Sequence, residues 1–236
     1  MPSAGNAFRA RSRPSTVAAS AIDAHATPKG HREARPPAHY RAAGKETVIA
    51  DSISGNDIVV AHNGNIYVTS PDGIDKPSRL YLIRPDGKKE LVDEGLKFAN
   101  GLCFTPDQTQ LYVAESATHW IWIYTIEPDG KLSFKQRYGW LHVRDMDDNA
   151  WPDGLRCDTA GRVYVTTRMG LQILDQAGRV NAIISIPAGQ PSNLCFAGKD
   201  FDIMYLTAGD KVYRRKFRTR GANNFEKPYK PVAPKL

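Results

Sequence analysis

The chain has 236 residues, of which 41% are hydrophobic, and its formal net charge is +7. This apolar content allows a packed core in one large domain, and no apolar run approaches the roughly 18 residues of a membrane-spanning helix. We therefore expect a globular protein without a membrane partner.

The positive charge lies at the two ends of the chain. Residues 1–45 carry a net +6 and residues 211–236 a net +8, and subtracting both from +7 leaves −7 for residues 46–210. An acidic body suits a cation site better than a groove for nucleic-acid phosphates. We therefore expect no nucleic-acid partner.

The first 45 residues differ in composition from the rest of the chain. They are rich in Ala, Arg, Pro, Ser and His, and they contain no apolar stretch long enough for a secretory signal. We predict a disordered or non-homologous N-terminal segment over residues 1–45, and a cytoplasmic location is the default expectation. Two alternatives stay open at this point: a transit peptide, against which the prolines argue, and a mistaken start site or reading frame.

From residue 46 onward the sequence repeats one pattern. Each copy begins with Asn or Asp, continues into a short apolar stretch and a turn, and closes with a second apolar stretch that contains a tyrosine. Such a pattern predicts two strands joined by a hairpin turn. The copies begin at Asn56, Asn100, Asp153 and Asn193, and their tyrosines are Tyr67, Tyr112, Tyr164 and Tyr205.

Further pairs of predicted strands follow the first three copies, beginning near Ser78, Trp120 and Gly170. Four strands per unit of roughly 40–50 residues are typical of a propeller blade. A β-sandwich would also contain many short strands, but it would not repeat the same polar residue at the same point of each unit. We predict an all-β propeller with about four blades over residues 46–220, followed by a C-terminal tail over residues 221–236. The stretch KETVIADSISG, just before Asn56, is predicted to be the outer strand of an earlier blade.

The repeated polar residues predict a ring around the propeller axis. The innermost strand of each blade lines the central channel, so residues at the same end of these strands meet around one mouth of it. Carboxylate and amide oxygens in such a ring would suit a hard cation such as Ca²⁺, Mg²⁺ or Mn²⁺. The alternative is that Asn and Asp begin strands because their side chains bind the local backbone. The predicted ring consists of Asn56, Asn100, Asp153 and Asn193, with Asp57 beside the first.

The three cysteines do not show the spacing of a metal site or of a disulfide framework. Cys103, Cys157 and Cys195 each lie within an apolar strand-like stretch of a different copy. Neighbouring blades diverge outward, so the short Cα separation that a disulfide needs is not expected. We predict that all three are buried and unpaired.

Two segments carry a resemblance to a known family. NGLCFTPDQTQLYVAES from Asn100 and PDGLRCDTAGRVYVTT from Pro152 resemble signature segments of the gluconolactonase/regucalcin (senescence marker protein)/luciferin-regenerating-enzyme family, and SGNDIVVAHNGNIYVTS from Ser54 resembles the blade before them. The resemblance covers about residues 46–220. It implies a six-bladed propeller that hydrolyses sugar lactones or related cyclic esters with a divalent metal in its channel, and a chain that lacks the first blade and a half.

The resemblance also assigns site residues. Asn100 and Asp153 match the family's metal-binding Asn and Asp, Asn56 matches the Asn beside metal and substrate, and Asp153 could also guide the attacking water. Calcium is the first expectation for the metal, with zinc, magnesium and manganese as alternatives. The ligand partner is a small-molecule lactone, for whose selection Trp120, Trp140 and Trp151 are candidates.

One family ligand has no counterpart here. A Glu of the first blade, in a Glu-Gly-Pro or Glu-Ser-Pro setting, does not occur in this sequence. Asp57 and Glu115 are the carboxylates that could take its place. The sequence therefore leaves three interpretations: a lactonase impaired by truncation, a non-catalytic calcium- or partner-binding propeller, and an inactive fragment.

Overall fold

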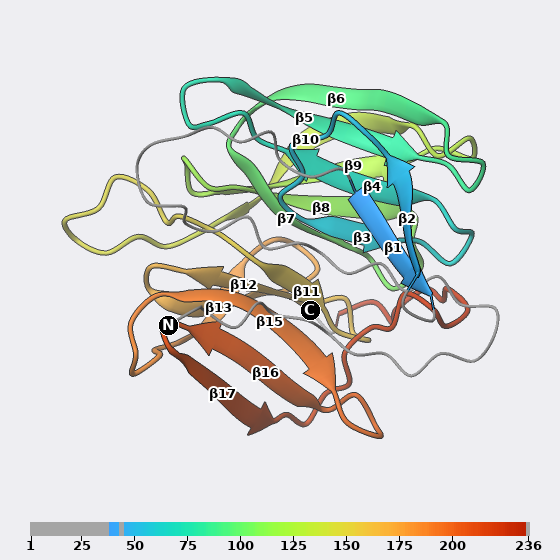
Figure 1. Cartoon of the computed structure of the whole chain (residues 1–236). Helices are drawn as coiled ribbons and strands as arrows, with labels where there is room; N and C mark the ends of the chain where they lie inside the picture. The colour runs from blue at the N-terminus through green and yellow to red at the C-terminus, as the bar shows by residue number, and fades with distance from the viewer. Residues whose placement is uncertain (1–37, 43–44, 235–236) are drawn as a thin grey trace.

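The computed structural model describes residues 38–42 and 45–234 (Figure 1). Within these residues, 17 strands form five antiparallel sheets, and no helix occurs. The described part therefore contains no helix that could cross a membrane.

Four of the sheets are blades, which we number I to IV in chain order. Blade I consists of β3 (Ile58–Val60), β4 (Ile66–Ser70), β5 (Pro77–Ile83) and β6 (Lys89–Lys97). Blade II consists of β7 (Ala99–Phe104), β8 (Gln110–Glu115), β9 (Trp120–Ile126) and β10 (Leu132–Trp140). Blade III consists of β11 (Leu155–Cys157), β12 (Val163–Thr167), β13 (Gly170–Leu174) and β14 (Val180–Ile184). Blade IV consists of β15 (Pro191–Ala197), β16 (Ile203–Ala208) and β17 (Lys211–Lys216).

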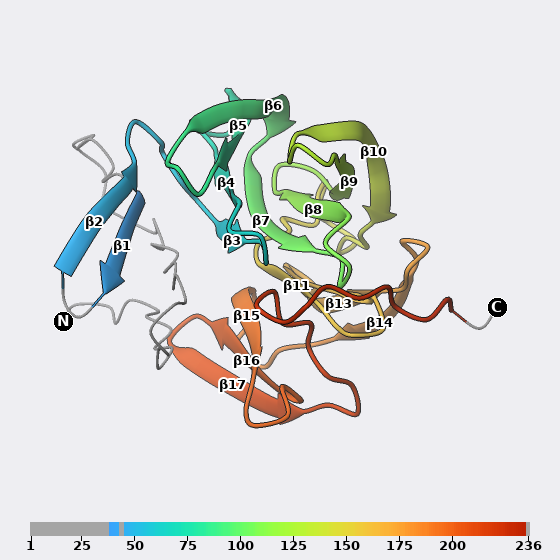
Figure 2. The same ribbon diagram turned by 90° about the vertical axis from the view of Figure 1, so that its right-hand side faces the viewer.

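The first strand of each blade is the innermost one. In every blade the strands pair in chain order, and contacts between blades run through the first strands, since β7 contacts β3 and β11 while β15 contacts β11. Figure 2 shows the four blades arranged around a common axis. The predicted all-β propeller with four blades is confirmed.

The hydrophobic core lies between the blades. Tyr67 of blade I packs edge-on against Phe104 of blade II at 5.6 Å between ring centroids, within a buried cluster shared by these two blades. A second cluster joins blades II and III through Tyr112 and Leu155. Because each blade buries its faces against its neighbours, the radial arrangement is held by apolar packing.

The cysteines are free, as predicted. Cys103 and Cys157 are buried in the cluster between blades II and III, but Cys195 on β15 is partly exposed. The prediction that all three are buried is therefore wrong for Cys195. This residue points away from the cluster that Leu194 and Phe196, its neighbours on β15, help to form, because successive side chains of a strand face opposite sides.

An antiparallel pair precedes blade I. It consists of β1 (Ala38–Ala42) and β2 (Lys45–Ala50). Residues 45–50 of the stretch predicted as the outer strand of an earlier blade thus form a strand, in a two-stranded sheet with β1, and the blade assignment stays a prediction. Ala50 and the following Ile53 pack into the core of blade I. Residues 1–37, which make up most of the predicted N-terminal segment, lie outside the described residues.

The chain after β17 crosses the blades at one end of the propeller, and we call residues 217–234 the C-terminal strap (Figure 2). The Ala222 amide donates to the Cys157 carbonyl of blade III at 2.9 Å. Gln108, in the first turn of blade II, donates through Nε2 to the Asn224 carbonyl at 2.9 Å. His62, in the corresponding turn of blade I, meets the Phe225 carbonyl through Nδ1 at 3.2 Å. The strap therefore joins three blades.

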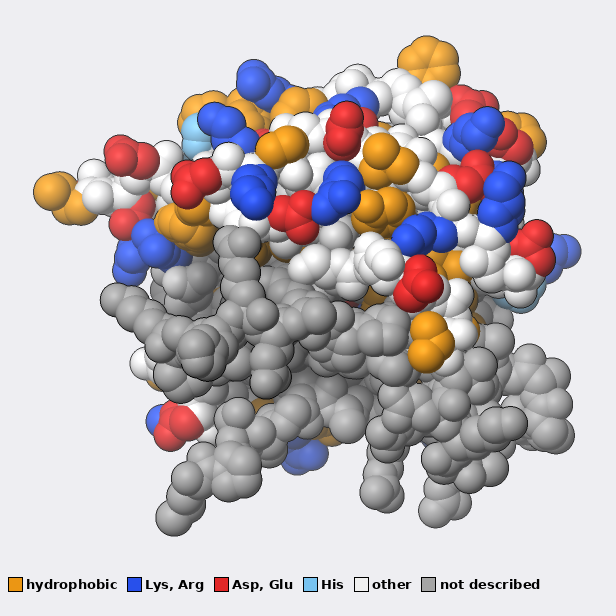
Figure 3. Space-filling view, turned by 45° about the horizontal axis from the view of Figure 1, so that its top comes forward, with side chains coloured by type: hydrophobic (Ala, Val, Ile, Leu, Met, Phe, Trp, Pro, Cys, Tyr) orange, Lys and Arg blue, Asp and Glu red, His pale blue; other side chains and the backbone are white. Residues whose placement is uncertain are grey.

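Charged side chains of both signs are interspersed on the coloured part of one face of the molecule. On the face shown in Figure 3, Lys and Arg side chains alternate with Asp and Glu side chains and do not form a patch of one sign. Lys135 of β10 pairs with Asp93 of β6 at 2.7 Å, which links the outer strands of blades I and II.

Candidate functional site

The strand register shows which residues occupy equivalent positions in the four blades. The repeated tyrosine of the second strand pairs with the residue three positions after the start of the repeat in blades I to III, but only two positions after Asn193 in blade IV. These pairs are Val59–Tyr67, Cys103–Tyr112, Arg156–Tyr164 and Cys195–Tyr205. Counting back three residues gives one equivalent position per blade, which we call the ring position, and it is held by Asn56, Asn100, Asp153 and Ser192.

Asn193 is therefore not a ring residue, and this prediction is wrong. It corresponds to Asp57, and the two share two local hydrogen bonds. The side-chain Oδ1 of each accepts from the amide of the next residue, at 2.8 Å in both blades. The amide of each donates to a threonine hydroxyl of the second strand, at 3.0 Å to Thr69 and 3.1 Å to Thr207. At this position the local backbone role of Asn and Asp is the one realised.

Hydrogen bonds through Thr69 and Gly101 link successive ring positions. The Thr69 hydroxyl of blade I donates to the Asn100 carbonyl at 2.7 Å, while the Asn56 amide donates to the Thr69 carbonyl at 2.8 Å. The Gly101 amide donates to the Asp153 carbonyl at 3.2 Å. The structure thus brings Asn56, Asn100 and Asp153 together at one end of three consecutive inner strands.

The glycines after Asn100 and Asp153 permit this close approach. A Cβ on Gly101 would lie 2.3 Å from the Asp153 carbonyl oxygen, and a Cβ on Gly154 would lie 2.9 Å from the Asn193 Cα. Both distances are shorter than real Cβ contacts, so any larger residue would force the inner strands apart. The glycines of the Asn-Gly and Asp-Gly pairs are therefore needed for the close packing of the inner strands at the ring.

Asn100 is held in one orientation. It is 6% exposed, and its Nδ2 lies 2.9 Å from the Ser116 hydroxyl oxygen. That hydroxyl donates its single proton to the Pro152 carbonyl at 2.5 Å, so it can only accept from Asn100. The amide must therefore present Nδ2 to Ser116 and turn Oδ1 the other way. No sequence signal identified Ser116, because its contacts join residues far apart in the chain.

The two carboxylates that could replace the missing Glu already bind other groups. Asp57 is buried and accepts from the Leu102 amide through Oδ2 at 3.1 Å, and Arg156 lies 3.8 Å from the same oxygen. Glu115 accepts from the Lys97 amide through Oε1 at 2.7 Å and from the Trp122 indole through Oε2 at 2.9 Å. These contacts show both residues holding strands together.

Arg156 was not singled out from the sequence. It stands three residues beyond Asp153 on β11 and reaches towards Asp57, which links blade III to blade I. Burial raises the pKa of the nearby Cys103 thiol to about 12, although the charge of Arg156 opposes this shift. The thiol is therefore protonated at neutral pH and is no candidate nucleophile.

The donor set of the ring consists of oxygen atoms. Asp153 supplies the carboxylate, Asn100 supplies an oriented amide oxygen, and Asn56 supplies a second amide. Within residues 38–42 and 45–234, no three His, Cys, Asp or Glu side chains gather as a metal cluster. The ring therefore fits a hard divalent cation bound by amides, one carboxylate and water, and it lacks the nitrogen and sulfur ligands of a typical zinc site.

The three candidate tryptophans lie at different places. Trp151 is two residues before Asp153, in the connection between blades II and III, and the Arg168 guanidinium lies over its ring at 4.6 Å. Trp120 and Trp140 pair with each other on the two outer strands of blade II. Only Trp151 of these three adjoins a ring residue in the chain.

Comparison with known proteins places the chain in a family. The model of the SMP-30/Gluconolactonase/LRE-like region matches residues 6–210. The chain is 27% identical to a gluconolactonase of Zymomonas mobilis over 198 residues, which cover 75% of this chain and 56% of that protein. It is 27% identical to regucalcin of Danio rerio over 143 residues, which cover 58% and 46%.

Solved structures show the same fold. A gluconolactonase from Xanthomonas campestris aligns with a TM-score of 0.64 and 24% identity, covering 75% of this chain and 64% of that one. A calcium-binding regucalcin from Agrobacterium tumefaciens aligns with a TM-score of 0.66 and 17% identity, covering 82% and 73%.

The chain belongs to the SMP-30/gluconolactonase/LRE-like family. It spans about half the length of the curated relatives it matches. The match extends into residues 1–45, whose assignment as disordered or non-homologous stays a prediction. The roles of Asn56, Asn100 and Asp153 also stay predictions, although the structure brings the three residues together.

Proposed function

We propose that this chain hydrolyses a sugar lactone at the ring of Asn56, Asn100 and Asp153, with the help of a divalent cation. One observation carries the proposal: the three residues meet on adjacent inner strands, joined by the contacts of Thr69 and Gly101. Family membership supports the same reaction, since relatives at 27% identity and below include a gluconolactonase. Calcium is the first candidate for the cation, and magnesium, manganese and zinc are the alternatives.

Asn100 and Asp153 would hold the cation, and Asn56 would face the substrate. A divalent cation at such a site polarises a carbonyl oxygen and lowers the pKa of bound water. Asp153 is the one carboxylate among the four ring positions, so it orients the attacking water and accepts its proton. Asn56 donates through its amide to the oxygens of the lactone.

The surrounding contacts fix the Asn100 side chain and the Asp153 backbone before substrate arrives. Ser116 holds the Asn100 amide, and the Asp153 backbone is bound on both sides, since its amide donates to Thr166 at 3.0 Å and its carbonyl accepts from Gly101. Groups held in place in this way need little reorganisation during the reaction. The ring is therefore suited to catalysis by positioning.

The test is hydrolysis of glucono-1,5-lactone followed by proton release, with and without a chelator. We expect chelator to abolish activity and added Ca²⁺ or Mn²⁺ to restore it. Asp153→Asn should lower kcat/KM by about 10²-fold or more, because it removes the proton acceptor. Asp210→Asn is the matched control, since Asp210 is exposed, with 86% of its side chain accessible. Activity that survives both chelator and Asp153→Asn would contradict the proposal.

A second function, calcium binding without turnover, is favoured by the donor set. The ring holds one carboxylate, and Asp57 and Glu115 are bound elsewhere. Ca²⁺ takes carboxylate and amide oxygens as ligands, whereas a single carboxylate that binds the cation leaves no second acid or base at the ring for turnover. Calorimetry with Ca²⁺ separates the two functions: heat of binding that depends on Asp153, without lactone hydrolysis, would support the binding role.

A further inference from the structure

Trp120, Trp140 and Trp151 lie at the end of the propeller where the ring residues lie, but they differ in their distance from the ring residues. Trp120 begins β9 and pairs with Trp140 at the end of β10. Adjacent strands are about 4.8 Å apart, so β9 and β10 lie roughly 10 and 14 Å out from β7. The two indoles pack on each other, 4.9 Å between ring centroids. They therefore lie on the outer strands of blade II, away from the inner strands that carry the ring residues.

Trp151 is within reach of a lactone bound at Asp153. It stands two positions before Asp153, with only Pro152 between them, and two residues of chain span at most about 7 Å. Its φ of +48° is rare for a bulky side chain. Residues held in such a conformation cluster at ligand sites, where the surrounding structure imposes them.

The backbone on both sides of Trp151 is fixed. The Ala150 amide donates to the Thr118 carbonyl at 3.3 Å, and the Ala150 carbonyl accepts from the Arg168 amide at 3.0 Å. The Pro152 carbonyl accepts from Ser116, the residue that orients Asn100. Trp151 is thus tied to the hydrogen-bond network that shapes the ring.

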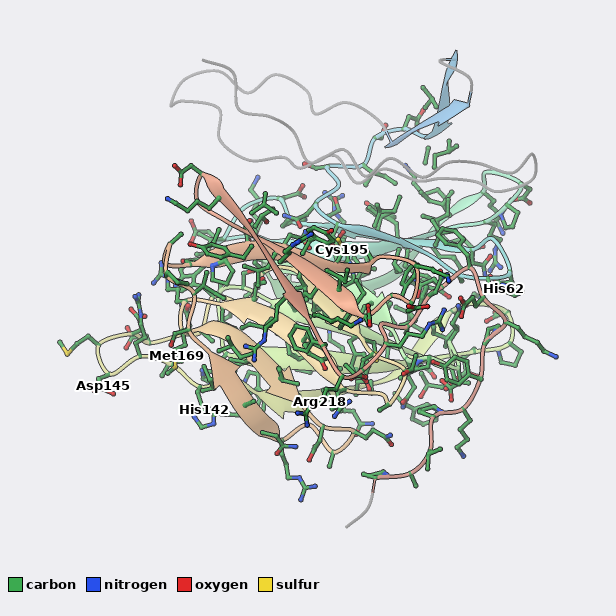
Figure 4. All side chains as sticks on the ribbon, turned by 90° about the horizontal axis from the view of Figure 1, so that it is seen from below. His62, His142, Asp145, Met169, Cys195 and Arg218 are labelled. Carbon is green, nitrogen blue, oxygen red and sulfur yellow. The ribbon has the colours of Figure 1, made fainter. Side chains whose placement is uncertain are left out.

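One face of the indole is covered and the side chain is half-buried. The Arg168 guanidinium lies over it at 4.6 Å, and the same guanidinium lies 3.7 Å from Asp147. In Figure 4 the loop that carries Asp145 projects from the body, with His142 and Met169 near its base. Arg168 therefore covers one face of the indole and ties it to Asp147 of this loop.

We propose that Trp151 binds the substrate by stacking the face opposite Arg168 on the C–H groups of a cyclic sugar lactone, and that Arg168 is a positioning residue for this indole. The inference rests on the proposed function for the identity of the ligand. Sugar rings present apolar C–H faces between their hydroxyl groups, and indoles are large, rigid, amphipathic surfaces that match them. Trp151 then selects ring-closed substrates beside Asp153.

The test compares kcat and KM for glucono-1,5-lactone. Trp151→Leu should raise KM about fivefold to tenfold and leave kcat unchanged, because stacking is made equally in the ground and transition states. Trp151→Phe should restore most of the affinity. Arg168→Gln should raise KM to a smaller extent, again without a change in kcat. Trp140→Leu is the matched control and should leave KM unchanged.

A binding measurement keeps this inference separate from the lactonase proposal. The probe is 1,5-anhydroglucitol, a pyranose without a carbonyl, titrated by calorimetry and by tryptophan fluorescence. Weaker binding to Trp151→Leu, in a protein that hydrolyses no lactone, would support the sugar-stacking role while the catalytic proposal fails. Equal binding by wild type and Trp151→Leu, with thermal unfolding confirming that both are folded, would overturn it. The same loss in Trp140→Leu would also overturn it.

Discussion

Replacement of Gly101 by alanine should damage both the fold and the ring. The new Cβ would lie 2.3 Å from the Asp153 carbonyl oxygen, so β7 and β11 must separate by about 0.7 Å to reach the shortest contact that proteins show. The obstacle is backbone, which cannot rotate away as a side chain can. This movement would also stretch the 3.2 Å hydrogen bond between the Gly101 amide and that oxygen.

The overpacking and the lost hydrogen bond together set the size of the expected fall in stability. Overpacking costs about 1–3 kcal/mol and a lost hydrogen bond about 0.5–1.5 kcal/mol, so the free energy of unfolding should fall by roughly 2–4 kcal/mol. For a chain of this size the melting temperature should fall by roughly 4–16 °C. Since Asn100 and Asp153 move apart, lactonase kcat/KM should fall by about 10- to 100-fold, measured well below either melting temperature.

Gly55→Ala is the matched control for this experiment. Gly55 lies just before the inner strand β3, but a Cβ there would meet Val68 at 3.4 Å, an ordinary contact distance. We expect a change within about 0.5 kcal/mol. An unchanged melting temperature for Gly101→Ala, or equal losses for both variants, would refute the argument from close approach.

Three further predictions concern stability and reactivity. Burial raises the pKa of Tyr67 from 10.0 to about 12 and that of Cys103 from 9.0 to about 12, so the unfolded chain loses these protons first and stability should fall as pH rises from 9 to 12. The midpoint of urea unfolding, compared at pH 8 and 10.5, measures this loss of stability. Tyr67→Phe should make the fall in stability above pH 10 shallower, and an equally steep fall in the variant would contradict the prediction. A thiol reagent at pH 8 should modify the partly exposed Cys195 before the buried Cys103 in the native protein. Peptide mass mapping after proteolysis measures the order of modification, and modification of Cys103 first would contradict the burial described for the two thiols. Deletion of residues 218–236 should lower the melting temperature by several degrees, because the contacts that the strap makes to three blades are lost; an unchanged value would show that the strap contributes nothing.

The repeated hairpins could be predicted from sequence because their signals are local. Each hairpin combines alternating apolar residues with Gly or Asp turns, and the tyrosines Tyr67 and Tyr205 fall at the same register in the structure. The same local reading placed Asn193 in the ring, because an Asn was expected where the structure has Ser192. The pairing of Tyr205 with Cys195 places Ser192 at the ring position, and residue type alone does not reveal this.

Other features of the site depend on contacts that no local pattern records. The orientation of Asn100 follows from a hydroxyl 16 residues away that also reaches Pro152. Trp140 and Trp151 are near each other in sequence, yet one lies on the outermost strand of blade II and the other beside a ring residue. Such distinctions arise from the order in which strands pack, and this order is a tertiary property.

The C-terminal strap has a consequence for how the protein folds. The contact between His62 and the Phe225 carbonyl spans 163 residues, and that between Gln108 and Asn224 spans 116. Contacts between residues so distant in the chain close large loops and form slowly. During synthesis, blades I to III emerge before the segment that joins their turns, so their hairpins must persist on local pairing and packing until the strap arrives. We expect hydrogen exchange during refolding to protect the β7–β8 hairpin early and the strap amides last.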